Sequence, residues 1–494
     1  MAVFTRIADD SSTLRSRVLD SLFWLSAARV AGQFINWLVT IWVIRILSPE
    51  DYGLMAMAMV FISAFSLLHE FGLGPALTRS PNLDEMALRK AFGIVLVSNA
   101  LLFWVLLLGA PLVAWFYGSE ELTPLVRLLA MQFIGMSFAV VPRSLMEGRL
   151  EFRKVAFGDL IANLSGTLVT LILALHGYGV WALTVGVVTI SFLRAGIFNL
   201  LCPCPGLPIF SLRGMHEFLK FGGAITLERI LWFIYHQADV LIAGKLLGKE
   251  ALGFYAVGKS IAALPSDKLS PIIQQIALPA FARIQSDRDR VGNSLIACVN
   301  ALGVFACPVF FGICAVGLDL MTTLLGEKWA PAALPLKTYS LILPLGMISG
   351  LLLSALKAIG RADVSLKNVA FGSLLMTTAF MVGSRWDLTG LSLAWVVAYP
   401  LYFLITLIRS SPVLGTTPSV LAAKVSRPMA ASVVMLVSVF ILGRMIGEAL
   451  PHGPARLTVL ALIGASVYGA GMLTFGHKSL TDAVALIRRN RSSS

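Results

Sequence analysis

Charged residues are scarce in this sequence. Asp, Glu, Lys and Arg together make up 13% of the 494 residues, whereas hydrophobic residues make up 57%, and the mean hydropathy is +0.84. Because soluble globular proteins contain about 25% charged residues, this composition excludes a soluble globular protein. Segments of about ten residues with alternating polarity, which build membrane β-barrels, are also missing. The chain is therefore predicted to be an all-α membrane protein.

Motifs of enzymatic chemistry are missing as well. The sequence contains no Walker phosphate loop, no Gly-x-Ser-x-Gly and no His-Glu-x-x-His, which argues against ATP hydrolysis, esterase and metalloprotease chemistry. Cysteine is rare, and Cys202-Pro-Cys204 is too closely spaced for a usual zinc pair and has no histidine nearby. We therefore expect no metal, no cofactor and no enzymatic activity.

Long apolar runs are abundant. Many are near 20 residues, which is enough to cross a hydrocarbon core of about 30 Å as a helix. The first of them follows a polar segment, residues 1–21, that lacks the pattern of a cleavable signal peptide. We predict 14 transmembrane helices, at 22–44, 53–73, 91–116, 123–142, 155–175, 178–200, 219–241, 252–278, 294–317, 334–356, 364–384, 389–408, 428–447 and 456–476.

The net charge of +13 could indicate a nucleic-acid partner, but the positions of the charges favour a membrane topology. Cytoplasmic loops of membrane proteins are enriched in Lys and Arg. With the N-terminus in the cytoplasm, 25 of the 39 Lys and Arg residues fall in inside segments, eight in outside segments and six within spans. This distribution predicts an even number of spans, both termini in the cytoplasm and no nucleic-acid partner.

Part of the chain repeats itself. The segment 45–56 aligns without gaps on 245–256, and four residues recur 200 positions apart: Leu47, Glu50, Gly53 and Ala56 match Leu247, Glu250, Gly253 and Ala256. A second match pairs Val155-Ala-Phe-Gly158 with Val369-Ala-Phe-Gly372. Since a unit of six spans is even, both copies enter the membrane from the same side and form parallel repeats, between which transporters commonly bind their substrate.

The repeat predicts how the chain is divided. Two six-helix bundles are expected to be followed by two helices that have no counterpart in the first half. The predicted parts are a cytoplasmic segment 1–21, a bundle 22–200, a cytoplasmic linker 201–218, a second bundle 219–408, two extra helices within 409–476 and a basic cytoplasmic tail 477–494.

Charged residues inside the spans are the candidate functional residues, because a charge near mid-membrane costs about 2.5–3.5 kcal/mol on insertion scales. The repeat register places Arg29 on Arg229, in the first helix of each bundle. Arg29, Gln33 and Asn36 follow helical spacing on one face. His236 and Asp239 lie at helical spacing on the face of Arg229. Each first helix thus has one polar stripe.

Two arginines that face one cavity are suited to a pyrophosphate, since each guanidinium can bind two oxygens. Lys259, in the next span, adds a third cation. The predicted substrate-binding residues are Arg29, Arg229, Lys259, Gln33, Asn36 and His236, and the acids predicted to couple transport to an ion are Asp239 and Glu70. The alternative is local neutralisation, of Arg229 by Glu228 or Asp239 and of Arg29 by Glu70, or snorkelling of Arg29 toward the cytoplasm.

Several turns resemble those of a known family. Arg45-Ile-Leu-Ser-Pro-Glu-Asp-Tyr-Gly-Leu and Glu70-Phe-Gly-Leu-Gly-Pro-Ala-Leu resemble the bacterial polysaccharide transporter family, the Wzx-type O-antigen and exopolysaccharide flippases. Gly148-Arg149-Leu-Glu-Phe-Arg153 and Asp239-Val-Leu-Ile-Ala-Gly244 fit the same pattern. The chain looks similar to the colanic acid and xanthan exporters, within the multidrug, oligosaccharidyl-lipid and polysaccharide exporter superfamily.

This resemblance implies a fold like the multidrug and toxin extrusion (MATE) transporters, with two six-helix bundles in a V. It implies an inner-membrane flippase whose substrate is undecaprenyl pyrophosphate carrying an oligosaccharide repeat unit, with a polymerase and export proteins as partners. The alternatives are a MATE-like drug or cation antiporter, a peptidoglycan-precursor flippase and a membrane glycosyltransferase. The short outer loops argue against a glycosyltransferase.

The arginine pair can be tested by substitution. Replacing Arg29 or Arg229 with Ala should abolish polymer export, because the pyrophosphate would lose one of its two cationic ligands. Replacing either with Lys should retain part of the activity, since the charge stays while the two-pronged geometry is lost. Export is measured as extracellular polymer, and insertion as the amount of protein in the membrane fraction. Normal export by both Ala variants would contradict the clamp.

Overall fold

The computed structural model describes residues 32–69, 85–149, 151–203, 206–210, 216–446, 450–451, 453–477 and 479–482, and the side chains of α9 only from residue 233. Every regular element in this described part is a helix. The chain forms two compact units, which are treated separately below. Unit 1 consists of Met1–Ser48 and Phe61–Leu227, and unit 2 of Pro49–Val60 and Glu228–Ser494.

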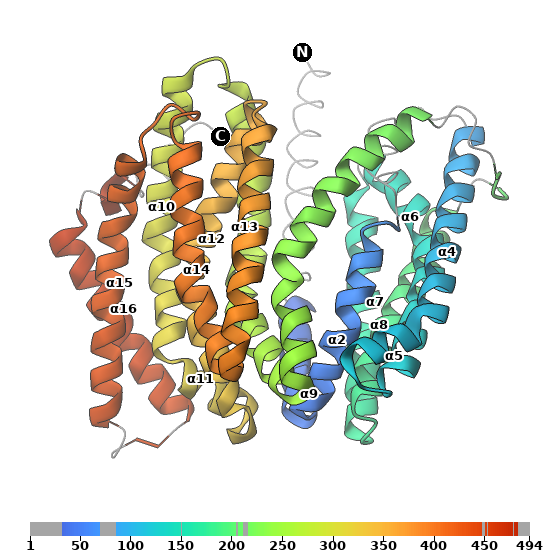
Figure 1. Cartoon of the computed structure of the whole chain (residues 1–494), viewed down its shortest axis with the longest axis horizontal. Coiled ribbons are helices and arrows are strands. Elements are labelled where there is room, and N and C mark those ends of the chain that lie inside the picture. The colour runs from blue at the N-terminus through green and yellow to red at the C-terminus, as the bar shows by residue number, and fades with distance from the viewer. Residues whose placement is uncertain are drawn as a thin grey trace, which may run out of the picture. The chain divides into compact units, whose positions relative to one another are not determined.

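Unit 1 is built around consecutive helices that pack against one another (Figure 1). An apolar helix, Gly32–Ile46, comes first. It is followed by the end of α2 (Pro49–Ser66), α4 (Glu85–Tyr117), α5 (Leu122–Ala130), α6 (Gln132–Gly148), α7 (Phe152–Leu175) and α8 (Val180–Leu201). The longest shared face in this unit is between α7 and α8, and α8 also packs against α6.

Unit 2 contains most of α9 (His216–Arg283), which is interrupted at Gly248, where φ is +85°. Such a φ is unfavourable for any residue with a side chain, so glycine permits the turn between the two halves of α9. The unit continues with α10 (Arg288–Ala315), α11 (Gly317–Leu325), the 3₁₀ helix η1 (Glu327–Ala332), α12 (Ala333–Ala358), α13 (Ala362–Gly383), the 3₁₀ helix η2 (Ser384–Trp386), α14 (Asp387–Ser410), α15 (Pro418–Ile446) and α16 (Pro454–Phe475).

The predicted all-α, multi-span fold is confirmed. Each of the 14 predicted spans corresponds to a helix or part of one, and α9 contains two of them, on either side of Gly248. Nine stretches of described residues are long and apolar enough to cross a membrane. Two details were not predicted. The fourth span is divided into α5 and α6 at Met131, and the connection after the ninth span is itself helical, as α11 and η1.

The repeated residues meet at one end of unit 2. A Cβ atom on Gly53 would overlap the backbone of Lys249, and a Cβ on Gly253 would overlap the backbone of Pro49. The two glycines, 200 positions apart in the sequence, thus make reciprocal contacts where the start of α2 crosses α9. Lys249 Nζ also lies 3.0 Å from Glu50 Oε2. The repeated glycines are therefore explained by a backbone crossing that admits no side chain.

Trp329 completes this end of unit 2. It is fully buried, and its ring packs edge-on against Tyr52 and Phe254, with centroids at 5.7 Å and 6.0 Å respectively. These three rings come from α2, α9 and η1 and surround the glycine crossing. All three segments were predicted to face the outside of the membrane, so their meeting at one end is consistent with the predicted order of spans.

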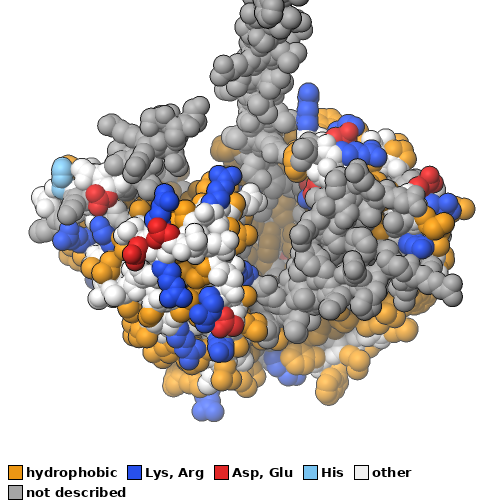
Figure 2. Space-filling model, turned by 90° about the horizontal axis from the view of Figure 1, so that it is seen from above, with side chains coloured by type: hydrophobic (Ala, Val, Ile, Leu, Met, Phe, Trp, Pro, Cys, Tyr) orange, Lys and Arg blue, Asp and Glu red, His pale blue; other side chains and the backbone are white. Residues whose placement is uncertain are grey.

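The opposite end of unit 2 gathers three connections that were predicted to be cytoplasmic. Arg288, Arg361 and Leu414 line one small cavity there, of about 140 Å³, and they belong to the α9–α10, α12–α13 and α14–α15 connections. The turn from α9 to α10 lies at the top of Figure 1. Figure 2 looks onto this end from above, where Lys and Arg side chains stand out among the described atoms.

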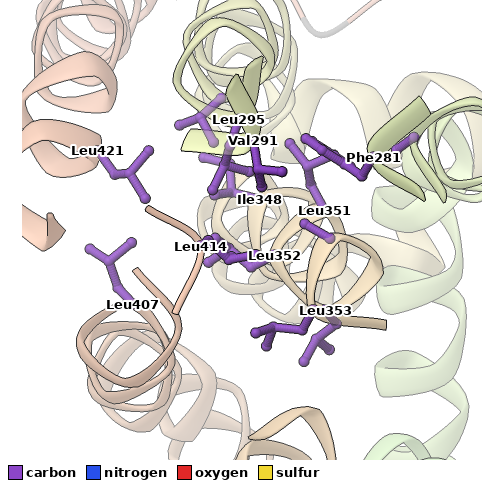
Figure 3. Packing of buried hydrophobic residues seen from close by; sticks show 14 of the residues in the cluster. Phe281, Val291, Leu295, Ile348, Leu351, Leu352, Leu353, Leu407, Leu414 and Leu421 are labelled. Atoms are coloured by element: carbon purple, nitrogen blue, oxygen red, sulfur yellow. The ribbon is translucent and has the colours of Figure 1, made fainter. Parts of the chain in front are cut away.

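The hydrophobic core of unit 2 lies below these connections. Leu295 and Val299 of α10 pack with Leu351 and Leu352 of α12, and with residues from the end of α9, α14 and α15 (Figure 3). Lipid tails are as apolar as leucine, so burial from water does not drive this packing, and close van der Waals contact holds such helices together.

The two extra helices are α15 and α16, and polar contacts join α16 to the rest of unit 2. Arg456, at the start of α16, forms an ion pair with Asp319 of α11 at 3.0 Å, and both side chains are largely buried. Tyr468 of α16 donates a hydrogen bond to the Val304 carbonyl of α10 at 2.7 Å. These contacts hold α16 against α11 and against the middle of α10.

The glycine crossing predicts a strong effect of small side chains. Gly53→Val or Gly253→Val should destabilise the protein by about 3 kcal/mol or more, because the overlapping atoms belong to backbone that cannot rotate away. Gly469→Val is the control, because a Cβ at Gly469 meets no atom within 4 Å. The measurement is the thermal midpoint of unfolding of the purified protein, and size-exclusion chromatography after heating reports how much folded protein remains. Equal midpoints for all three variants would contradict the tight crossing.

Candidate functional site

A buried ion pair joins the two halves of α9. Asp239 lies before the break at Gly248 and Lys259 after it, and Lys259 Nζ contacts Asp239 Oδ2. The Asp239 side chain is 1% exposed and that of Lys259 is 17% exposed. Isolated charges are very costly in such an environment, but a hydrogen-bonded pair of opposite charges can be kept there.

Asp239 is held by further hydrogen bonds. Its Oδ1 accepts a bond from the Val240 N–H at 2.9 Å, and its Oδ2 accepts one from the Tyr255 hydroxyl at 2.6 Å. The Tyr255 oxygen in turn accepts a bond from Trp395 Nε1 of α14 at 2.7 Å. The carboxylate is thereby fixed, and it connects α9 to α14 through two buried side chains.

Three aromatic rings surround the ammonium of Lys259. The Nζ atom lies 5.2 Å from the centre of the Trp395 ring, 5.4 Å from that of Tyr339 and 5.9 Å from that of Tyr255. At these distances a cation is attracted to the negative face of a ring. Lys259 also donates a long hydrogen bond, 3.4 Å, to the carbonyl of His236. The ammonium is thus stabilised on several sides by the protein itself.

A cavity opens beside this ion pair, within unit 2. Its volume is about 450 Å³, and α9, α12 and α14 line it. The α9 side contributes polar residues, namely His236, Ser266, Asp267, Ser270 and Gln274. The facing side contributes the aromatic residues Tyr339 of α12 and Trp395, Tyr399 and Tyr402 of α14. Ligand pockets in proteins are commonly about 300–1,000 Å³ and combine apolar walls with a few polar groups.

The structure brings together three of the predicted residues, His236, Asp239 and Lys259. His236 lines the cavity and is exposed there, whereas Asp239 and Lys259 stand behind the wall as a pair. Their roles in binding and ion coupling stay predictions. The charge of Lys259 is balanced by Asp239, and the alternative pairing of Arg229 with Asp239 stays a prediction, because the Arg229 side chain lies outside the described part of the chain.

Two predicted residues lie in unit 1. Asn36 Oδ1 accepts a hydrogen bond from the Thr167 hydroxyl of α7 at 2.6 Å, and the Asn36 carbonyl accepts one from Thr40 at 2.8 Å. Gln33 is partly exposed on the same helix. Arg29 and Glu70 lie outside the described residues, and Arg229 lies in α9 where only the backbone is described. The predicted arginine clamp therefore stays a prediction.

Unit 1 contains a charge network that sequence reasoning did not assemble. Arg194 of α8 forms an ion pair with Asp159 of α7 at 2.7 Å, and Arg143 of α6 lies 3.7 Å from the other oxygen of the same carboxylate. Arg143 also pairs with Glu147 at 2.9 Å. Asp159 and Arg194 are opposite charges within adjacent predicted spans, and this was the sequence pattern that could have revealed the pair.

The aromatic wall of the cavity was also missed. Trp395, Tyr399 and Tyr402 follow helical spacing on α14, so they share one face. Aromatic stripes in membrane helices usually pack against neighbouring helices or lie at the interface with water, and only the position of α9 distinguishes this stripe as a cavity wall.

A bundle of membrane-spanning helices with a polar cavity inside it is an architecture that membrane transporters use. The comparison with protein families supports this class and makes it specific. The model of a family described as polysaccharide biosynthesis protein matches residues 42–334. The chain belongs to this family, as the resemblance of its turns predicted.

Characterised relatives cover most of the chain. It is 23% identical to the lipopolysaccharide biosynthesis protein WzxC of Escherichia coli (strain K12), over 82% of this chain and 83% of that protein. It is 24% identical to the succinoglycan biosynthesis transport protein ExoT of Rhizobium meliloti (strain 1021), over 86% of both chains. The prediction of a transporter in polysaccharide biosynthesis, and not an enzyme, is confirmed.

Solved structures share the fold. The lipid II flippase MurJ in its inward closed conformation has a TM-score of 0.75 at 14% identity, and the match covers 92% of this chain and 100% of MurJ. An inward-facing MATE family transporter of the MOP superfamily has a TM-score of 0.59 at 14% identity, over 78% of this chain and 95% of that transporter. The predicted MATE-like fold is confirmed.

The ion pair predicts non-additive stability effects. Asp239→Asn should lower stability by about 3–5 kcal/mol, because the substitution leaves the Lys259 ammonium buried without a counter-charge. The double variant Asp239→Asn with Lys259→Met should lose much less than the sum of the two single variants, since no buried charge remains. Glu50→Gln is the control, because the exposed Glu50–Lys249 pair should be worth less than about 1 kcal/mol. The thermal midpoints of Asp239→Asn, Lys259→Met, the double variant and Glu50→Gln are measured. A double variant that loses the sum of the two single losses would contradict a coupled pair.

Proposed function

We propose that this protein is a flippase that moves undecaprenyl-pyrophosphate-linked oligosaccharide repeat units across the bacterial inner membrane, for exopolysaccharide or O-antigen biosynthesis. The observation that carries the proposal is the family match over residues 42–334. A relative named as a transport protein for succinoglycan biosynthesis, similar over 86% of this chain, supports transport as the activity. In this role both termini lie in the cytoplasm, and a polymerase and export proteins receive the product.

The cavity in unit 2 supports a polar cargo. A membrane protein that carried only a lipid tail would need no polar cavity within its helical bundle, whereas a glycan headgroup must be shielded from the hydrocarbon core. The polyprenyl tail would stay in the lipid while the headgroup crosses inside the protein. Rocking between inward and outward states moves the site across the membrane, and the direction depends on the different binding free energies of the two states.

The predicted pyrophosphate ligands in this proposal are Arg29 and Arg229, one from the first helix of each repeat. Asp239 and Glu70 are the predicted coupling acids. Because Lys259 balances Asp239, coupling through Asp239 would require the pair to separate or to exchange its proton during the transport cycle. This is a stricter requirement than that of a lone carboxylate in a cavity.

A peptidoglycan-precursor flippase is the second candidate, and the likeness of fold to the lipid II flippase MurJ favours it over a drug antiporter. Both candidates transport a polyprenyl-linked sugar, so they differ in the glycan and in the consequence of losing the protein. Loss of a precursor flippase stops cell-wall synthesis, whereas loss of a repeat-unit flippase stops only the surface polymer.

Deletion of the gene tests the proposal. The mutant should lose its surface polymer, remain able to grow and accumulate a full-length, unpolymerised repeat unit on polyprenyl pyrophosphate in the inner leaflet. Extraction of lipid-linked sugars followed by mass spectrometry measures this accumulation, and complementation with the intact gene is the control. A truncated repeat unit would indicate a glycosyltransferase, accumulation of the peptidoglycan precursor would support the second candidate, and unchanged lipid-linked sugars would contradict both flippase functions.

A further inference from the structure

We propose that the cavity of unit 2 binds a sugar ring of the transported glycan and does not bind the pyrophosphate. The inference rests on the proposed function, and it divides the substrate between two places in the protein. The cavity meant here is the one of about 450 Å³ between α9, α12 and α14. Three properties of its walls carry the argument, namely their charge, their polar edge and their aromatic faces.

The charge of the cavity disfavours a pyrophosphate. Among the described residues that line it, none is Lys or Arg, and Asp267 is a carboxylate that is exposed to the cavity. Lys259, a described cation beside the cavity, is neutralised by Asp239 and has three aromatic rings around it. A pyrophosphate would therefore meet a like charge without a compensating cation, which is unfavourable in surroundings of low dielectric constant. An uncharged sugar has no such cost.

The polar edge suits hydroxyl groups. Asp267, Ser270 and Gln274 are spaced by three and four residues along α9, so they lie on one helical face. The carboxylate accepts hydrogen bonds, the amide both donates and accepts, and the serine hydroxyl does either. Asp267 and Gln274 are exposed. Each hydroxyl of a sugar ring both donates and accepts hydrogen bonds, so one ring has several groups that can bind to these side chains.

The opposite wall is aromatic, and its rings are held in fixed orientations by packing on one another. Trp395 packs nearly edge-on against Tyr339, with centroids 4.9 Å apart and planes at 73°, and Tyr399 packs in the same way on Tyr402 at 5.5 Å and 71°. The hydrogen bond from Trp395 to Tyr255 also restrains the indole. The C–H face of a sugar ring is weakly positive and packs on the negative face of an aromatic ring. Trp395, Tyr399 and Tyr402 are buried, whereas Tyr339 is half-buried, so Tyr339 is the ring of this wall that a sugar can contact, together with the polar edge.

Two glycines of α12 allow the walls of the cavity to approach one another closely. Gly346 and Gly350 lie one helical turn apart and both line the cavity. A Cβ atom at Gly346 would come within 3.3 Å of the Tyr399 hydroxyl, and one at Gly350 within 3.2 Å of Gln274 Nε2. A side chain at Gly350 would therefore press on Gln274 and displace its amide from the polar edge.

The neighbouring glutamines of α9 allow a matched test. Gln274 lines the cavity, whereas Gln275 is also exposed but does not line it. The probe is the repeat-unit oligosaccharide released from the host's own polymer, and the second probe is undecaprenyl pyrophosphate without sugar. Binding of each to the purified full chain in lipid nanodiscs is measured by saturation-transfer NMR and by competition. Extraction of lipid-linked sugars from the deletion strain is performed in parallel.

We expect Gln274→Leu to weaken binding of the oligosaccharide about tenfold, the effect of losing one or two hydrogen bonds. Gly350→Val should abolish oligosaccharide binding, and Gln275→Leu should change it less than twofold. All three variants should bind the sugar-free lipid as the unsubstituted protein does.

Oligosaccharide binding that is equal in Gln274→Leu and Gln275→Leu, or that survives Gly350→Val, would overturn the sugar site. The sugar site would also be overturned if the unsubstituted protein bound the sugar-free lipid but not the oligosaccharide. In these cases the proposed function stands if the deletion strain still accumulates the lipid-linked repeat unit, and it fails separately if that accumulation is missing.

Discussion

The buried pair of Asp239 and Lys259 is the interaction around which unit 2 is organised. It connects the two halves of α9 across the break at Gly248, and through Tyr255 it reaches Trp395 of α14. A charge in this environment must be neutralised where it stands, because neither water nor lipid can do so. The two halves of α9 and the aromatic wall of the cavity are consequently held in one arrangement by a single carboxylate.

The two ends of unit 2 are built by different means. At the end predicted to face outside, two glycines make a reciprocal backbone crossing and Trp329 packs around it. At the opposite end, three connections with basic residues converge above a core of leucine, isoleucine and valine. Rigid packing at one end and polar connections at the other are compatible with a bundle that rocks as a body, as alternating access requires.

The cavity changes how the substrate is expected to be recognised. A set of cations was predicted to hold a pyrophosphate, yet one of them, Lys259, is already paired with Asp239 and surrounded by aromatic rings. The proposed separation, with the glycan against aromatic rings and the pyrophosphate on arginines, gives each part of an amphipathic substrate the chemistry that suits it. It is also consistent with relatives that are named for different polymers, lipopolysaccharide and succinoglycan, because the aromatic and polar walls can change while the predicted arginine clamp is kept.

The sequence alone was sufficient for the class, the fold and the family. Apolar runs must form helices in lipid, since each backbone polar group has to be satisfied within its own segment, and the turns around Glu50 and Gly53 identified both the repeat and the family. The sequence could not identify which residues the charged side chains contact. Lys259 with Asp239, Arg194 with Asp159, and the stripe of Trp395, Tyr399 and Tyr402 acquire their roles only when separate helices meet. Spacing along one helix shows which residues share a face, but the neighbour of that face is decided by tertiary packing.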